Sequence, residues 1–164
     1  MTHYSFGDVV LIKFPSMAPC LFLLFNHKIT PFQEKDARVN LGVGRIVEPP
    51  EEIARLWRRI PPDLENIEGY LSPNREWFNA HGEKGDFILI QGDFGACFLM
   101  VKFAFENGFV PVYSTTEREA VEADGEDGSV MLTHRFKHRI FRRYECDSRD
   151  ELRHGALKNE RGLG

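Results

Sequence analysis

The segment from Asp86 to Thr116 constrains the fold of this chain more than any other part of the sequence. An apolar stretch of strand length leads into the residues GDFGA, then into a helical stretch, and then into a second apolar stretch of strand length. This order is typical of a βαβ unit, in which the two strands run parallel. It predicts a parallel sheet with a loop, residues 91–96, at the carboxyl end of a strand, where open α/β sheets usually bind ligands.

Residues 91–96 have features that suit a ligand. Gly92 and Gly95 carry no side chain, so the backbone there can approach a bound molecule closely. Asp93 can cap the following helix or contact a ligand, and the N–H groups at the start of that helix attract anions. The same residues also fit a tight strand-to-helix turn that binds nothing. The sequence of this loop leaves both interpretations open.

The residues before this unit predict a similar arrangement. The run CLFLLFN, Cys20 to Asn26, is continuously apolar, which is typical of a strand buried on both faces in a parallel sheet. Thr30 then fits a helix N-cap, with Pro31 at the first helical position and Gln33 completing a capping box. We expect this helix to end near Leu41, with a short strand at 44–47 and helical segments between residues 50 and 81.

The residues after the unit predict a hairpin. Residues 118–123 and 130–144 flank the turn-rich sequence DGEDGS, which favours two long antiparallel strands. The complete order predicts one α/β domain over residues 20–146, a sandwich with a mainly parallel sheet and an antiparallel flank. Residues 1–19 are expected to be an N-terminal extension, and residues 147–164 a flexible tail.

Composition excludes several classes of function. The formal net charge of −4 gives no general reason to expect DNA as a partner, although residues 134–143, HRFKHRIFRR, are locally basic. The three cysteines stand far apart, which indicates neither a zinc site nor a disulfide framework, and no apolar run is long enough to span a membrane. GxGxxG, GxxxxGK[ST], HExxH and GxSxG are all missing. We therefore expect a cytoplasmic protein that has no metal, cofactor, DNA or membrane partner.

Three polar clusters follow predicted strands, at residues 26–30, 91–96 and 114–118. The carboxyl ends of parallel strands meet at one edge of a sheet, so we expect these clusters to converge. Their hydroxyls, glycine-containing turns and cations suit recognition of a phosphodiester or a nucleotide. Each cluster also has a structural interpretation: His27 as a surface loop residue, Thr115 and Thr116 as residues that satisfy nearby backbone groups, and HRFKHRIFRR as a strand with a solvated basic face.

Four segments together resemble a known family. They are LFLLFNHKIT, PPEEIARLWRRIPPDLENI, KGDFILIQGDFGACFLMVKFAFENGFVPVYSTTERE and FKHRIFRRYE, which occur in this order over about residues 20–145. The chain resembles the small proteins of type III CRISPR systems that are grouped with the stand-alone ring nucleases. These are relatives of the CRISPR-associated Rossmann-fold (CARF) sensor domains. The resemblance implies a Rossmann-like, CARF-like three-layer sandwich.

The resemblance also implies an activity, which is metal-independent cleavage of cyclic tetra-adenylate to linear di-adenylate with 2′,3′-cyclic phosphate ends. Such a ligand has near two-fold symmetry, so we predict a homodimer. His27 is the candidate general acid or base, and Lys28 or Arg118 would stabilise charge in the transition state. Asp93 is an alternative group for orienting the attacking hydroxyl. The predicted ligand-binding residues are Asn26, Thr30, Gln91, Gly92, Asp93, Phe94, Gly95, Ala96, Thr115 and Thr116.

Two other functions remain possible from the sequence. The first is a protein that binds the same cyclic oligoadenylate without cutting it, as a sponge or a sensor, because binding and cleavage need the same pocket. The second is a nucleic-acid-binding or toxin-like module, which residues 6–14 and the basic hairpin suggest. The continuous apolar strands and the βαβ order disfavour this second alternative.

Overall fold

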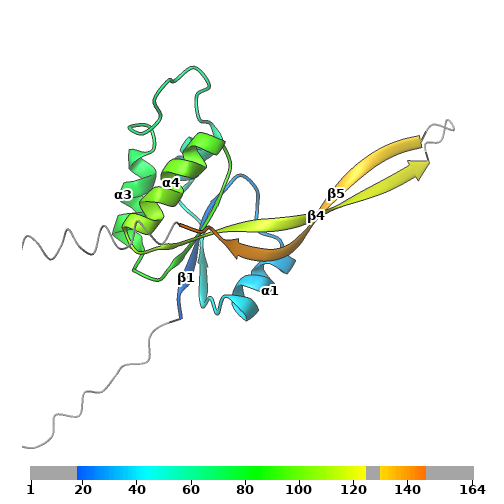
Figure 1. Ribbon diagram of the computed structural model, residues 1–164, viewed down its shortest axis with the longest axis horizontal. Coiled ribbons are helices and arrows are strands. Elements are labelled where there is room, and N and C mark those ends of the chain that lie inside the picture. Colours follow the sequence, from blue (N-terminus) through cyan, green and yellow to red (C-terminus); the bar gives the residue numbers. More distant parts are fainter. Residues whose placement is uncertain (1–17, 125–129, 147–164) are drawn as a thin grey trace, which may run out of the picture.

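Alternating strands and helices make up the part of the chain that the computed structural model describes, residues 18–124 and 130–146 (Figure 1). The elements are β1 (Cys20–Phe25), α1 (Pro31–Asn40), β2 (Arg45–Val47), α2 (Glu51–Arg58), α3 (Ser72–His81), β3 (Phe87–Gln91), α4 (Phe94–Glu106), β4 (Val110–Asp124) and β5 (Val130–Arg143). The expectations for residues 1–17 and 147–164 lie outside the described residues. No helix within the described ranges is both long enough and apolar enough to cross a membrane.

The strands form a single sheet in the order β2-β1-β3-β4-β5. β1 pairs in parallel with β2 and with β3, and β3 pairs in parallel with β4. Only the β4–β5 pair is antiparallel. The fold class predicted from the sequence, a Rossmann-like α/β fold with a mainly parallel sheet and an antiparallel C-terminal hairpin, is therefore confirmed.

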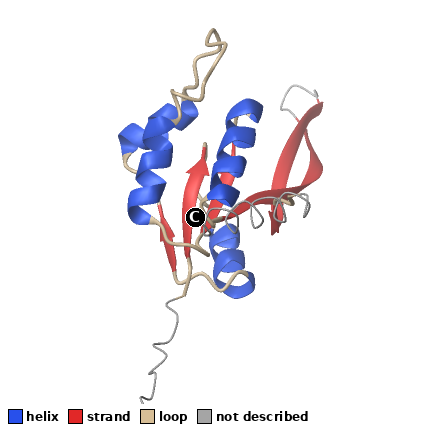
Figure 2. Cartoon of the chain, turned by 60° about the vertical axis from the view of Figure 1, so that its left-hand side comes forward, coloured by secondary structure: helices blue, strands red, loops and turns tan. Residues whose placement is uncertain are grey.

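The direction in which each connection crosses the sheet decides which face its helix covers. The chain moves from β1 to β2 in one direction along the sheet, and from β3 to β4 in the other. Because parallel crossovers are right-handed, these opposite directions put α1 and α4 on opposite faces. Figure 1 shows α1 across the sheet from α3 and α4, and Figure 2 shows the strands flanked by helices.

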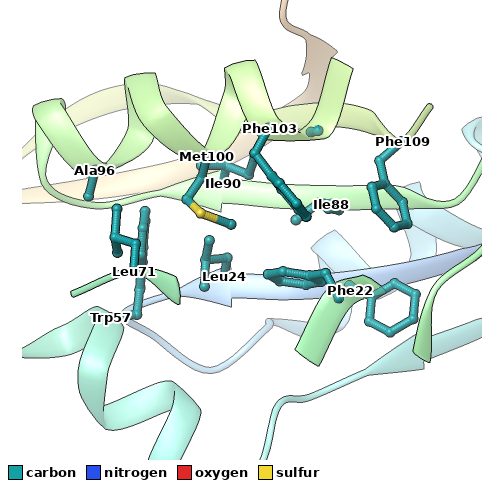
Figure 3. Close-up of a cluster of buried hydrophobic side chains, with 12 residues drawn as sticks. Phe22, Leu24, Trp57, Leu71, Ile88, Ile90, Ala96, Met100, Phe103 and Phe109 are labelled. Carbon is teal, nitrogen blue, oxygen red and sulfur yellow. The ribbon is translucent and has the colours of Figure 1, made fainter. Parts of the chain in front are cut away.

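Both faces of the sheet are apolar, which explains why the β1 sequence is continuously apolar. Phe22 and Leu24 point to the face covered by α2, α3 and α4, where they join the larger core cluster. Leu21 and Leu23 point to the other face and pack in a smaller cluster that includes Ala37 of α1. Figure 3 shows the larger cluster, with side chains of β1 and β3 packed against those of α4.

The helix α1 begins as the sequence predicts. The Thr30 hydroxyl accepts from the Gln33 N–H, and the Gln33 side chain accepts from the Thr30 N–H, so the capping box is complete. Pro31 occupies the first helical position. After the helix, Gly42 has a φ of +70°, a conformation that favours glycine and ends the helix where the sequence predicts.

The strand β4 differs from the expectation. The sequence suggested that one strand ends near Ser114 and that a separate hairpin strand begins at Arg118, but β4 is a single strand of 15 residues. It pairs with β3 at its start and then continues with β5 as a long two-stranded ribbon, which extends beyond the helices in Figure 1. The physical reason is that β5 pairs with β4 from Val112 to Asp124, with one irregularity at Thr115, so the polar residues STTER do not end the strand.

Candidate functional site

The candidate site lies at the carboxyl ends of β1 and β3. These neighbouring strands feed helices on opposite faces of the sheet, so the chain leaves them in opposite directions and a crevice remains between the two connections. Phe25, the last residue of β1, is paired with Gln91, the last residue of β3. The loop at 26–30 and the turn at 91–96 are therefore side by side, as the sequence predicts.

A cleft of about 340 Å³ lies between the β1 exit loop and α2. Asn26, His27 and Lys28 line one wall, and Trp57 and Arg58 line the other. The volume is within the range of small-molecule sites. The cleft thus contains three of the residues that the sequence singles out, together with α2 residues that it did not.

The cleft carries both signs of charge. Glu51 of α2 lines it but forms an ion pair with Arg58, at 2.5 Å between Oε1 and Nη2. Lys28 and Glu48, which also lines the cleft, take part in none of the ion pairs found among the described residues. Lys28 is therefore a cation left to a ligand, with a carboxylate in the same cleft. The His27 ring is exposed and meets the Phe25 ring edge-on, with 5.3 Å between the ring centroids. This contact restricts the orientation of the imidazole, which lines the same cleft as Lys28.

The turn between β3 and α4 is held by contacts within the protein. Asp93 is the N-cap of α4, and its Oδ1 accepts from the Ala96 N–H at 2.9 Å. The Ala96 side chain is fully buried, so it contacts the core and not a ligand. Of the first three N–H groups of α4, those of Phe94 and Gly95 remain for an anion. Phe94 itself is 94% exposed.

The two glycines of the turn differ in how much space there is for a side chain at each position. A Cβ at Gly92 would lie 2.9 Å from the Trp57 Nε1, because the indole packs directly on this backbone and donates to the Gln91 carbonyl at 3.2 Å. The space that the sequence assigns to a ligand beside Gly92 is thus occupied by Trp57. A Cβ at Gly95 would make only ordinary contacts, the nearest at 3.4 Å. Neither glycine has a positive φ.

These contacts predict opposite results for two alanine substitutions. Gly92→Ala is expected to lower the free energy of unfolding by about 1–3 kcal/mol, because the buried indole has no room to move. Gly95→Ala is expected to be neutral or to stabilise slightly, by up to about 1 kcal/mol, because alanine favours the first turn of a helix. Urea denaturation of both variants measures the difference. Equal midpoints for the two would show that Trp57 does not restrict position 92.

The third polar cluster lies inside β4 and not in a loop. The Thr115 hydroxyl accepts from the Ile140 N–H at 3.2 Å and donates to the Ile140 carbonyl at 3.1 Å, which satisfies backbone groups at an irregularity in the β4–β5 pairing. Thr116 is opposite His138, and Arg118 is opposite Phe136 further along the ribbon. None of these three side chains lines the cleft. These contacts support the structural interpretation of Thr115 as a residue that satisfies nearby backbone groups.

A buried network of polar side chains lies beside the site, and the sequence did not indicate it. The hydroxyl of Ser114 is 2.6 Å from His138 Nδ1, and His138 Nε2 is 3.0 Å from Asp36 Oδ2. Gln33 Nε2 donates to the Ser114 hydroxyl oxygen at 3.1 Å, and the Ser114 N–H donates to Gln91 Oε1 at 3.0 Å. The network joins α1, β3, β4 and β5.

The order of donors in this network follows from the carboxylate. Asp36 can only accept, so His138 donates to it through Nε2–H, and in the neutral imidazole Nδ1 accepts from the Ser114 hydroxyl. The His138 and Asp36 side chains are only 6% and 8% exposed. Ser114 is 5% exposed, and its hydroxyl is bonded on both sides, which leaves it no access to a substrate. We interpret the network as support for the site, because it fixes the Gln91 side chain at the sheet edge.

The pKa of Asp36 is lowered by its partners. Burial by itself raises the pKa, but hydrogen bonds from Asn40, from the Phe141 N–H and from His138 outweigh it. The Phe141 N–H donates to Asp36 Oδ2 at 2.8 Å. The carboxylate is therefore ionised at neutral pH and serves as an anchor between α1 and β5.

Cys97, in the first turn of α4, is unsuited to be a nucleophile. A helix amino terminus usually favours a thiolate, but here burial raises the thiol pKa. The Asp93 carboxylate raises it further, against a hydrogen bond from the Gly92 backbone that lowers it. The thiol therefore stays protonated at neutral pH. No group of three or more His, Cys, Asp or Glu side chains in the described ranges is arranged to hold a metal ion.

Comparisons with known proteins identify relatives of the chain. Residues 19–142 match the family described as "Uncharacterized protein MJ1673 family". The chain is 45% identical over 126 residues to the "Uncharacterized protein MJ1673" of Methanocaldococcus jannaschii, an alignment that covers 77% of this chain and 97% of the relative. No solved structure matches the chain.

Proposed function

The chain belongs to the MJ1673 family of uncharacterized proteins, and we propose that it is a ring nuclease that binds cyclic tetra-adenylate and cleaves it to linear di-adenylate. The observation that carries the proposal is the pairing of Phe25 with Gln91, which puts the loop at 26–30 beside the turn at 91–96 at the switch point of the sheet. The reaction would switch off the antiviral signal of a type III CRISPR system, in the cytoplasm.

The groups at the site favour a phosphodiester as ligand. In the cleft, Lys28 offers an ammonium group and Asn26 an amide. In the adjacent turn, outside the cleft lining, Phe94 and Gly95 offer the backbone N–H groups that begin α4. Gln91 adds an amide whose oxygen is already held by the Ser114 N–H, so that its NH₂ group remains for an acceptor. Most of these groups donate hydrogen bonds, and phosphoryl oxygens accept them.

The size of the cleft supports a dimer. A volume of about 340 Å³ is too small to enclose a ring of four nucleotides, so one cleft can contact only part of such a ring. A cyclic tetra-adenylate has near two-fold symmetry, so two copies of the protein around one ligand would each present the same cleft to half of it. The proposed active species is therefore a two-fold homodimer.

The proposed chemistry is transesterification without a metal. The 2′-oxygen of a ribose attacks the adjacent phosphorus, a 2′-O–P bond forms, and the P–O5′ bond breaks to leave a 2′,3′-cyclic phosphate. His27 takes the proton from the 2′-hydroxyl as general base, and the departing 5′-oxygen, on the opposite side of the phosphorus, takes a proton from water. Lys28 stabilises the negative charge that builds up on the phosphoryl oxygens. The site also holds the 2′-oxygen in line with the leaving group.

The two cations named from the sequence are not equivalent in this proposal. Lys28 lines the cleft, whereas Arg118 is four residues beyond Ser114 along β4, about 13 Å away at the rise of an extended strand. We therefore assign the transition-state charge to Lys28. Asp93 is engaged as the cap of α4, so it is not assigned a role in orienting the hydroxyl.

Ring cleavage is tested directly with the purified full chain. We expect it to convert an excess of cyclic tetra-adenylate to di-adenylate with a cyclic phosphate end in the presence of EDTA, over many turnovers. Liquid chromatography with mass spectrometry measures substrate and product, with cyclic tri- and hexa-adenylate in parallel. Tight binding without product would replace cleavage by a sponge or sensor function. No binding to any ring would overturn the proposal.

A further inference from the structure

The outer face of α4 is apolar. Its residues recur at intervals of four, three and four, which puts them in one stripe along the helix; they are Phe94, Phe98, Val101 and Phe105. We call these four residues the α4 stripe. The helical period puts the stripe opposite the buried face of α4, from which Met100 and Phe103 reach into the core (Figure 3).

The composition of this face is that of a covered surface. Phe94 is 94% exposed and Phe98 is 70% exposed in the single chain. A helix at the protein surface usually has charged and polar side chains on its outer face, whereas a helix that is apolar all round is buried. Within Phe94–Glu106 the only charged residues are Lys102 and Glu106, near the end of the helix. We therefore expect a partner on the α4 stripe.

The spacing of the stripe matches a second copy of the same chain. Intervals of four, three and four residues are those of the a and d positions along the contact of two parallel coiled-coil helices, where each residue meets its own copy. The charges beside the stripe allow this contact. Lys102 Nζ is 3.8 Å from Glu106 Oε1 of the same helix, so each ammonium group has an opposite charge in its own chain.

The exposed aromatic area is large enough to matter for a dimer. An aromatic side chain buries about 150–250 Å², so Phe94 and Phe98 at their exposed fractions of 94% and 70% offer roughly 250–400 Å² for each protomer. A stable interface of standard size buries about 800 Å² for each partner. These two side chains would supply a third to a half of that area, and the half-buried Val101 and Phe105 extend the same surface.

We propose that the α4 stripe is the interface of a two-fold homodimer in which the two α4 helices pack in parallel. The parallel direction rests on the proposed function, because α4 begins at the turn 91–96 and parallel helices bring both turns to the same side of the dimer. An antiparallel pair would hold the two turns at opposite ends of a helix of 13 residues, about 20 Å apart. The parallel dimer can therefore present two clefts to one ligand.

The interface is tested by the mass of the full chain in solution. Sedimentation velocity at micromolar concentration is expected to give twice the chain mass of 18.9 kDa. Phe98→Asp is expected to raise the dissociation constant of the dimer by about 100-fold or more, because it puts two unpaired carboxylates at the two-fold axis. A monomeric wild type would overturn the proposal and leave the stripe to a segment of the same chain or to another protein.

The matched control is Phe32→Asp. Phe32 is 73% exposed, like Phe98, but it belongs to α1 on the other face of the sheet, so its substitution is expected to leave the dimer intact. Phe94→Asp, at the most exposed position of the stripe, is a second disrupting variant. Circular dichroism confirms that each variant is folded. Folded Phe98→Asp and Phe94→Asp variants that remain dimeric would overturn the proposal.

The direction of the helices is tested by disulfide cross-linking in a Cys146→Ser background, which removes the exposed native thiol. Under oxidation, Phe94→Cys is expected to form a covalent dimer on a non-reducing gel, because position 94 meets its own copy in a parallel pair. Phe32→Cys is the control and is expected to stay monomeric on the gel. Absence of the cross-link in Phe94→Cys would overturn the parallel pairing.

The outcome is separable from ring cleavage, because neither the mass nor the cross-link needs a ring. A dimer that cross-links at position 94 but cleaves no ring would support the interface and remove the proposed function. A monomer that cleaves the ring would overturn the interface and leave the proposed function standing.

Discussion

Asp36→Ala is expected to lower the free energy of unfolding by about 3 kcal/mol at pH 7. The substitution removes the acceptor for three donors, the amide of Asn40, the imidazole of His138 and the N–H of Phe141, and a buried donor left without a partner costs about 1–3 kcal/mol. Urea denaturation followed by circular dichroism measures the loss. The substitution also weakens the connection between α1 and β5, two elements far apart in the sequence.

The effect of the substitution depends on pH, and its sign follows from the pKa of Asp36. The folded protein holds this pKa below its ordinary value of 3.8, so the carboxylate contributes stability above about pH 4. That contribution is lost as the pH falls through the folded-state pKa. The difference in stability between the wild type and Asp36→Ala should therefore be constant near neutral pH and should narrow below about pH 4.

Two variants make this prediction specific. Asp36→Asn keeps the shape and one acceptor oxygen, and is expected to lie between the wild type and Asp36→Ala. Asp63→Asn removes an exposed carboxylate and is expected to change stability by less than about 0.5 kcal/mol. An Asp36→Ala variant as stable as the wild type, or a difference that stays constant down to pH 3, would show that the network does not anchor α1 to β5.

His27→Ala is expected to reduce the turnover of cyclic tetra-adenylate by a factor of about 10² to 10⁴, with KM changed by less than about threefold. General acid–base catalysis by a histidine contributes rate enhancements of this size, and the exposed imidazole makes few contacts that would bind the ligand in its ground state. Steady-state rates with the purified ring give kcat and KM separately. Little change in stability is expected, because the side chain is exposed.

The control for this variant is His81→Ala. His81 is also exposed, but it stands at the end of α3, where it stacks on Trp77 at 5.2 Å between ring centroids and does not line the cleft. Its removal should leave turnover unchanged within about twofold. Unchanged turnover in His27→Ala, with the wild type active, would assign the proton transfer to another group while leaving ring cleavage intact.

Much of the fold follows from local patterns in the sequence. The continuous apolar run of β1 indicates burial on both faces, and the sequence TPFQ identifies the start of α1 with both of its capping hydrogen bonds. These features depend on neighbours within four residues, which is why they can be predicted. The proximity of residues 26–30 and 91–96 follows as well, since parallel strands bring their carboxyl ends to one edge.

The parts that the sequence did not predict depend on contacts between distant residues. The sequence predicted a loop at Ser114 to Arg118, because the pattern does not reveal that β5 will pair with β4 as far as Asp124. His138 read as one more residue of a basic strand, yet it is buried with Asp36, 102 positions earlier in the chain. The one available signal was the pair Gln33 and Asp36, polar residues three apart that share the inner face of α1.

The segment from Asp86 to Thr116 shows which features follow from local sequence patterns and which depend on long-range contacts. The sequence by itself determined that it forms a strand, a capped helix and a parallel strand, because period, capping and apolar runs are local properties. Only the tertiary structure decided that Trp57 fills the space beside Gly92, that Ser114 binds Gln91, and that β4 runs on past the sheet edge. The physical reason is that packing and cross-strand hydrogen bonds join residues that are far apart in the sequence, and no local sequence pattern indicates which of them will meet.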